Sequence, residues 1–76
     1  MATVAITGAT GHLGANLVRQ LVERGDEVRA LVRRPDPPEL RGLSLTQVRG
    51  DVVTGEGLDE LLDGAEQLYH LAAQSS

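Results

Sequence analysis

Hydrophobic and polar residues follow two different spacings in the first third of the chain. Residues 3–7 are apolar and β-branched, which is typical of a short strand buried on both faces. From His12 to Arg24, apolar residues recur three or four positions apart, which predicts a helix with one buried stripe. Gly25 follows directly and suits the left-handed position after a last helical turn. The pattern therefore predicts a strand followed by a helix.

The rest of the chain repeats this succession with shorter elements. Residues 27–33 alternate polar with apolar before turning apolar, which predicts a second strand. Pro35, Pro37 and Pro38 then exclude a regular element. The remaining elements that we expect are a third strand at 43–48, a short helix capped by Thr54 and ended by Gly64, and a fourth strand at 67–73.

This order of elements specifies an α/β fold. Strands that alternate with helices form a parallel sheet with right-handed crossovers. In a doubly wound sheet of this kind the four strands are expected in the order 3-2-1-4. A crevice then opens between the first and fourth strands at their carboxyl ends, which is where such folds bind ligands.

Composition limits the size and the partners of this fold. The chain has 76 residues, a net charge of −4 and no cysteine, so we expect one small domain without disulfides in a reducing, cytoplasmic setting. The acidic balance argues against nucleic acid or an anionic membrane surface as a partner. No lysine is present, so chemistry that requires a lysine is excluded.

Three glycines in steps of three follow the first strand. Gly8 would permit the sharp turn, Gly11 a close approach to a pyrophosphate, and Gly14 tight packing of the helix on the sheet. The unpaired amides and the positive dipole end of the helix favour phosphate at this turn. The alternative is a glycine-rich turn that binds nothing. His12 lies near the expected phosphates, where a lone histidine is more often an exposed spacer.

The second and third strands carry the candidate adenosine contacts. An NAD site usually has a carboxylate at the end of the second strand, but this chain has Arg33 and Arg34 there. Two guanidiniums can bind a 2′-phosphate, which favours NADP over NAD, although an ordinary solvated strand end remains the alternative. Asp51 could accept a hydrogen bond from the adenine amino group, with Val52 against the ring. A plain turn role for Asp51 is equally open.

With these residues the chain resembles the extended short-chain dehydrogenase/reductase family, also called the NAD-dependent epimerase/dehydratase family. Residues 7–14 look like its TGxxGxxG phosphate loop, and 28–33 look like the second strand of its NADP-using, dihydroflavonol-reductase-like members. Residues 50–52 and 70–73 look like its adenine-side turn and its fourth-strand HxAA segment. The resemblance implies a Rossmann-like fold and an NAD(P) site. The expected cofactor contacts are Gly8, Thr10, Gly11, His12, Leu13, Gly14, Arg33, Arg34, Asp51, Val52, Leu71, Ala72 and Ala73.

The sequence departs from the family's catalytic pattern. The family uses a Tyr-x-x-x-Lys pair, whereas Tyr69 is followed four residues later by Ala73. Tyr69 and His70 are better explained as packing residues, and no metal-ligand spacing is present. We therefore expect residues 1–76 to be the amino-terminal half of such a Rossmann domain, a fragment or half-domain without catalytic activity of its own.

The fourth strand suggests a partner. Residues 68–72 would leave an apolar sheet edge without a neighbour, which invites pairing with another chain. A homo-oligomer joined through this edge would also enlarge the core of a small domain. The alternatives to a cofactor-binding half-domain are thus a self-associating folding unit without a ligand, or part of a non-catalytic NADP sensor.

Overall fold

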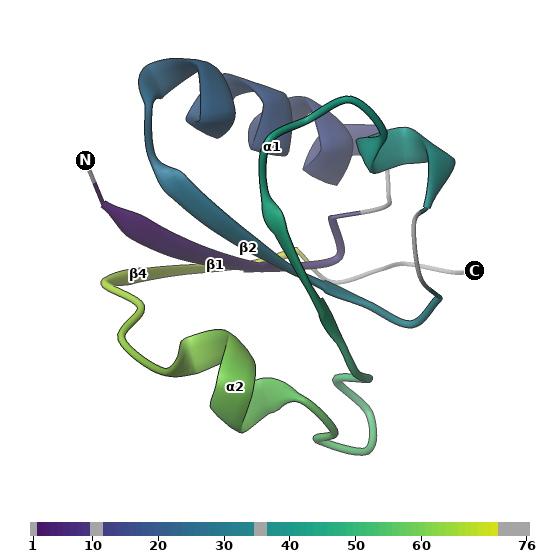
Figure 1. The fold of residues 1–76 in the computed structure, drawn as a ribbon. Coiled ribbons are helices and arrows are strands. Elements are labelled where there is room, and N and C mark those ends of the chain that lie inside the picture. The colour runs from purple at the N-terminus through teal and green to yellow at the C-terminus, as the bar shows by residue number, and fades with distance from the viewer. Residues whose placement is uncertain (1, 10–11, 35–36, 72–76) are drawn as a thin grey trace.

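Four parallel strands form one sheet with a helix on each face (Figure 1). The computed structural model describes residues 2–9, 12–34 and 37–71, except for the side chain of His12. The sheet has the order β3-β2-β1-β4, which confirms the predicted topology. Its strands are β1 (Thr3–Thr7), β2 (Glu27–Val32), β3 (Thr46–Arg49) and β4 (Gln67–His70), and its helices are α1 (His12–Arg24), α2 (Leu58–Leu62) and the 3₁₀ turn η1 (Pro38–Leu40).

The strand register brings the carboxyl ends of all four strands to one edge of the sheet. β1 pairs with β2 from Thr3 opposite Glu27, and with β4 through Thr7 opposite His70. β2 pairs with β3 up to Val32 opposite Arg49. Every pair is parallel, so the turn after each strand opens on this carboxyl edge.

Alternate residues of the central strands face two separate apolar cores. Ile6 and Val28 face α1 and contribute to the larger core, while Ala5 and Leu31 face α2 and contribute to the smaller one. This alternation explains why four of the five residues of β1 are buried, as expected of a strand covered on both faces. In the part of the chain described here, no helix has the length and apolar character needed to cross a membrane.

The second helix begins later than its expected Thr54 cap. Gly55 and Gly57 have φ values of 84° and 82°, in the left-handed region, which a helical turn cannot accommodate. The Thr54 hydroxyl instead accepts a hydrogen bond from the amide of Glu56, at 3.2 Å. The helix therefore starts after Gly57 and has five residues.

Three other expected boundaries also differ from the structure. The third strand starts at Thr46 rather than Leu43, because the Leu43 amide donates to the Leu40 carbonyl in a turn. The second strand ends at Val32 and the fourth at His70. The proline segment was expected to hold no regular element, yet Pro38 opens η1. Proline is accepted there because the first residue of a helix needs no hydrogen-bond donor.

The turn from α1 into β2 matches its sequence. Gly25 has φ 96°, as expected for a residue that ends a helix. The Arg24 guanidinium donates to Asp26, and the other carboxylate oxygen of Asp26 accepts from the amide of Ala2. These two hydrogen bonds, that of Arg24 first, hold the pKa of Asp26 below its usual value. The pair fixes the start of β1 beside the end of α1.

Candidate functional site

The turn after β1 is packed against the end of β4. Gly8 has φ 78°, a conformation that L-amino acids with a side chain rarely adopt. A Cβ on Gly8 would also overlap the carbonyl oxygen of Leu71, whose own amide donates to the Thr7 carbonyl at 3.0 Å. The turn after β1 and the end of β4 are therefore in direct backbone contact at this position.

Gly14 brings the start of α1 equally close to this turn. A Cβ on Gly14 would overlap the carbonyl oxygen of Gly8 and lie 2.8 Å from the Cα of Ala9. As at any helix start, the first-turn amides of α1 have no acceptor within the helix itself. Gly8 and Gly14 thus bring the end of β1 and the start of α1 close together, which is the strand-turn-helix arrangement in which such folds hold a pyrophosphate.

Several predicted contacts of this turn cannot be placed. Thr10, Gly11, Ala72 and Ala73 lie outside the described residues, and so does the side chain of His12. Leu13 is 78% exposed at the start of α1, and Leu71 is partly buried against the larger core.

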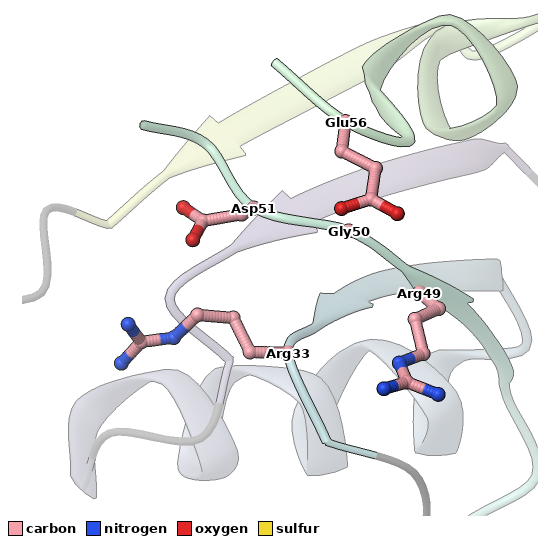
Figure 2. A pocket seen from close by; sticks show the side chains of 5 residues that line it. All are labelled: Arg33, Arg49, Gly50, Asp51 and Glu56. Atoms are coloured by element: carbon pink, nitrogen blue, oxygen red, sulfur yellow. The ribbon is translucent and has the colours of Figure 1, made fainter. Parts of the chain in front are cut away.

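A hollow of about 410 Å³ opens beside the ends of β2 and β3 (Figure 2). Its lining residues come from three places: the residue after β2, the last residue of β3, and the loop that follows β3. They are Arg33, Arg49, Gly50, Asp51 and Glu56. Because the strand order is β3-β2-β1, this hollow lies on the same carboxyl edge as the glycine turn, displaced by one strand.

Opposite charges occupy opposite walls of the hollow. Figure 2 shows the side chains of Arg33 and Arg49 below the backbone of Gly50, and the carboxylates of Asp51 and Glu56 above it. Among the described residues, no ion pair within 4.0 Å joins either arginine to either carboxylate. The hollow can therefore accept a ligand that has an anionic group on one side and hydrogen-bond donors on the other.

The loop between β3 and α2 holds the carboxylate wall in place. The Asp51 amide donates to the Glu56 carbonyl at 2.9 Å, and the Gly55 amide donates to the Asp51 carbonyl at 2.8 Å. One carboxylate oxygen of Asp51 accepts from the Val53 amide at 2.8 Å. Asp51 thus has the turn role that the sequence left open, while its side chain also lines the hollow.

The hollow brings together a different set of residues from the expected adenosine contacts. Arg34 and Val52 are exposed and are not among its lining residues. Arg49 and Glu56 line it, and sequence reasoning missed both. Arg49 reaches the hollow through the register of β2 and β3, which sets it opposite Val32 at the end of β2 and which the spacing within one segment does not specify. Glu56 was hidden by the incorrect assignment of its segment to a helix.

The carboxyl ends of β1 and β4 are joined by one side-chain hydrogen bond. The Thr7 hydroxyl forms a hydrogen bond with Nδ1 of His70, which stands opposite Thr7 in the sheet. Thr7 is buried and His70 is exposed, so this bond satisfies the hydroxyl next to the glycine turn. Tyr69, on the other face of β4, packs against the larger core. Within the described residues, no group of three His, Asp or Glu side chains gathers to hold a metal ion.

Comparison with known proteins places this arrangement in a family. The model of the NAD dependent epimerase/dehydratase family matches residues 4–76. The chain belongs to this family. The match confirms the resemblance noted from the four sequence motifs. The matched residues include both the glycine turn and the residues that line the charged hollow.

Curated relatives of this epimerase/dehydratase-family chain are much longer. "Sterol demethylase protein B" of Methylococcus capsulatus is 50% identical over 72 residues, which are 93% of this chain and 22% of that protein. "Ceramide reductase" of Caulobacter vibrioides is 51% identical over 70 residues, 91% of this chain and 22% of that protein. The chain therefore spans about a fifth of the length of these relatives.

A solved structure shares the fold over the whole chain. The Bordetella bronchiseptica enzyme WbmH, crystallised in complex with NAD⁺, matches with a TM-score of 0.82 and 28% sequence identity. The match covers 100% of this chain and 27% of the WbmH chain. The Rossmann-like α/β fold expected from the sequence is thus confirmed for this member of the epimerase/dehydratase family.

Proposed function

We propose that this chain is an NAD(P)-binding unit, similar to the cofactor-binding part of an NADP-dependent reductase or epimerase. The observation that carries the proposal is the glycine turn, where Gly8 turns the chain sharply after β1 and Gly14 lets the start of α1 pack directly against that turn. A pyrophosphate needs that arrangement. The WbmH structure, which binds NAD⁺, gives the proposal support from a related fold.

The dinucleotide would extend along the carboxyl edge of the sheet. Its pyrophosphate would contact the backbone of residues 8–14, including Thr10 and Gly11, with His12 and Leu13 beside it. Its adenosine would enter the charged hollow next to β2 and β3, with the adenine amino group donating to Asp51. Its nicotinamide ribose would lie toward Leu71, Ala72 and Ala73.

The arginine wall of the hollow favours NADP over NAD in this proposal. Arg33 follows β2 at the position where an NAD site usually has a carboxylate. Its guanidinium lines the hollow and could bind a 2′-phosphate through two parallel hydrogen bonds. An unphosphorylated ribose offers this guanidinium neutral hydroxyl acceptors alone, so the preference would come from the charge of the phosphate.

Calorimetric titration of the chain with NADPH and with NADH tests the proposal. We expect NADPH to bind more tightly, and we expect Arg33→Ala to weaken NADPH roughly tenfold, the effect of losing one hydrogen-bonded charge. NADH binding should change little. Arg19→Ala is the matched control, because Arg19 is exposed on α1 and contacts only Asn16 among the described residues. Absence of binding by either dinucleotide at millimolar concentration would disprove the proposal.

Catalysis is not part of the proposal for these 76 residues. The chain has no lysine, so it cannot contain the Tyr-x-x-x-Lys pair that its resemblance to reductases would otherwise imply. We propose that residues 1–76 correspond to the amino-terminal half of a Rossmann domain, with the substrate and catalytic groups supplied by other residues.

A second candidate function is self-association through β4. In the described residues β4 is paired with β1 alone, and Leu68 on this strand is 50% exposed. Pairing two such edges would join two sheets into one and bury Leu68.

Light scattering tests self-association directly. We expect a mass of at least twice 8.1 kDa for the chain. Leu68→Lys should return it to a monomer, because a charged edge residue opposes pairing. Thr46→Lys on β3, at the opposite edge of the sheet, is the control. A monomer of the unaltered chain at high concentration would contradict self-association.

A further inference from the structure

We infer that Arg49 is a specificity-determining residue, which together with Arg33 forms a two-sided clamp for a 2′-phosphate. The inference deepens the proposed function and rests on it, because it concerns the adenosine end of the same site. It replaces the adjacent pair Arg33 and Arg34, which the sequence suggests, with a pair drawn from two neighbouring strands.

The strand register places the two arginines beside each other. Val32, the last residue of β2, stands opposite Arg49, the last residue of β3. The Gly50 amide donates to the Val32 carbonyl at 2.9 Å, so the two strands stay joined up to the rim of the hollow. Arg33, one residue beyond Val32, therefore lies close to Arg49 along this edge of the sheet, and both side chains line the same hollow.

These two guanidiniums differ from the arginines that serve the fold. Arg24 donates to Asp26, and Arg29 donates to the Leu61 carbonyl at 3.4 Å. The guanidiniums of Arg33 and Arg49 have no hydrogen bond or ion pair with any residue that the structure describes. Two cations that face one space without protein partners are free to bind an anion with all their donors.

The opposite wall narrows the chemistry of that anion. Asp51 and Glu56 carry two negative charges into the same hollow, and these oppose the binding of a bare anion such as inorganic phosphate. A phosphorylated nucleoside satisfies both walls, because its phosphate can meet the arginines while its amino and hydroxyl groups donate to the carboxylates. The two walls therefore select a phosphate attached to a donor-rich group.

Arg34 is exposed, as Arg33 and Arg49 are, but it is not among the residues that line the hollow. The chain bends at Arg33 and Arg34 directly after β2, and of these two side chains the one that lines the hollow is that of Arg33. Arg49, from the next strand, supplies the second guanidinium instead.

Short nucleotides separate this inference from the proposed function. Adenosine 2′,5′-bisphosphate and adenosine 5′-monophosphate are each titrated into the chain, and they differ only in the 2′-phosphate. The unaltered chain should prefer the bisphosphate. Arg49→Ala and Arg49→Gln should each weaken the bisphosphate roughly tenfold, with little effect on the monophosphate. Arg19→Ala is the control for loss of an exposed arginine, and circular dichroism confirms that each variant keeps the fold.

Each outcome has a distinct meaning. A loss at Arg49 that exceeds the loss for Arg34→Ala supports the clamp. An equal loss of both nucleotides in the Arg49 variants, or a larger loss for Arg34→Ala, would overturn it while leaving a dinucleotide site in place. Failure of the unaltered chain to bind the dinucleotides and both short nucleotides would overturn the proposed function together with the clamp. Higher salt should reduce the preference for the bisphosphate, since the added contacts are between exposed charges.

Discussion

Replacing Gly8 with alanine is expected to unfold a large part of the population at room temperature. Gly8 has φ 78°, where a side chain costs about 1–2 kcal/mol. The added Cβ would also overlap the carbonyl oxygen of Leu71, which is backbone and cannot rotate away. Relief requires β4 to move from β1, and a domain of this size has only about 4–11 kcal/mol of total stability.

A second glycine separates the two causes of this loss. Gly55 has φ 84° but no atom within 4 Å of an added Cβ, so Gly55→Ala tests the backbone conformation without the overlap. Urea unfolding followed by circular dichroism should give a loss of about 1–2 kcal/mol for Gly55→Ala and clearly more for Gly8→Ala. Equal losses for the two variants would mean that β4 does not press on the glycine turn as described.

The sequence predicted the strands and their order because apolar runs or polar–apolar alternation mark the strands, and helical spacing separates them. β1 and α1 have the predicted bounds, since a five-residue β-branched run and a thirteen-residue apolar stripe leave little choice of boundary. The shorter elements were predicted less well. α2 has one fully buried residue, Leu61, and left-handed glycines decided where it begins. A pattern of apolar spacing does not contain that information.

The residues of the candidate site also differ in how well the sequence predicted them. Gly8 and Gly14 could be predicted because their role depends on a local strand-to-helix turn. Arg49 and Glu56 could not, because their position in the hollow depends on the register between β2 and β3 and on the bridge between Asp51 and Glu56. These are contacts between separate segments, which the spacing within one segment cannot specify.

Leu61→Ala is the other substitution from which we expect a large effect. Leu61 is fully buried and completes the smaller core with Ala5, Leu31 and Val48. Removing a buried leucine side chain typically costs about 2–5 kcal/mol, because the cavity left behind closes only in part. A helix of five residues has no independent stability, so α2 depends on this contact to stay on the sheet.

The adjacent Leu62 provides a matched control for this prediction. Leu62 is 42% exposed on the same helix, so Leu62→Ala removes the same atoms without opening a buried cavity and should cost less than about 1 kcal/mol. Thermal and urea unfolding of both variants measure the difference. Leu61→Ala should also loosen the loop that carries Asp51 and Glu56, two of the residues that line the hollow. The Leu61 amide donates to the Gly57 carbonyl, so this loop is joined to α2 and moves with it. Equal stability of the two variants would show that α2 does not cover this face of the sheet, and the carboxylate wall would then need another support.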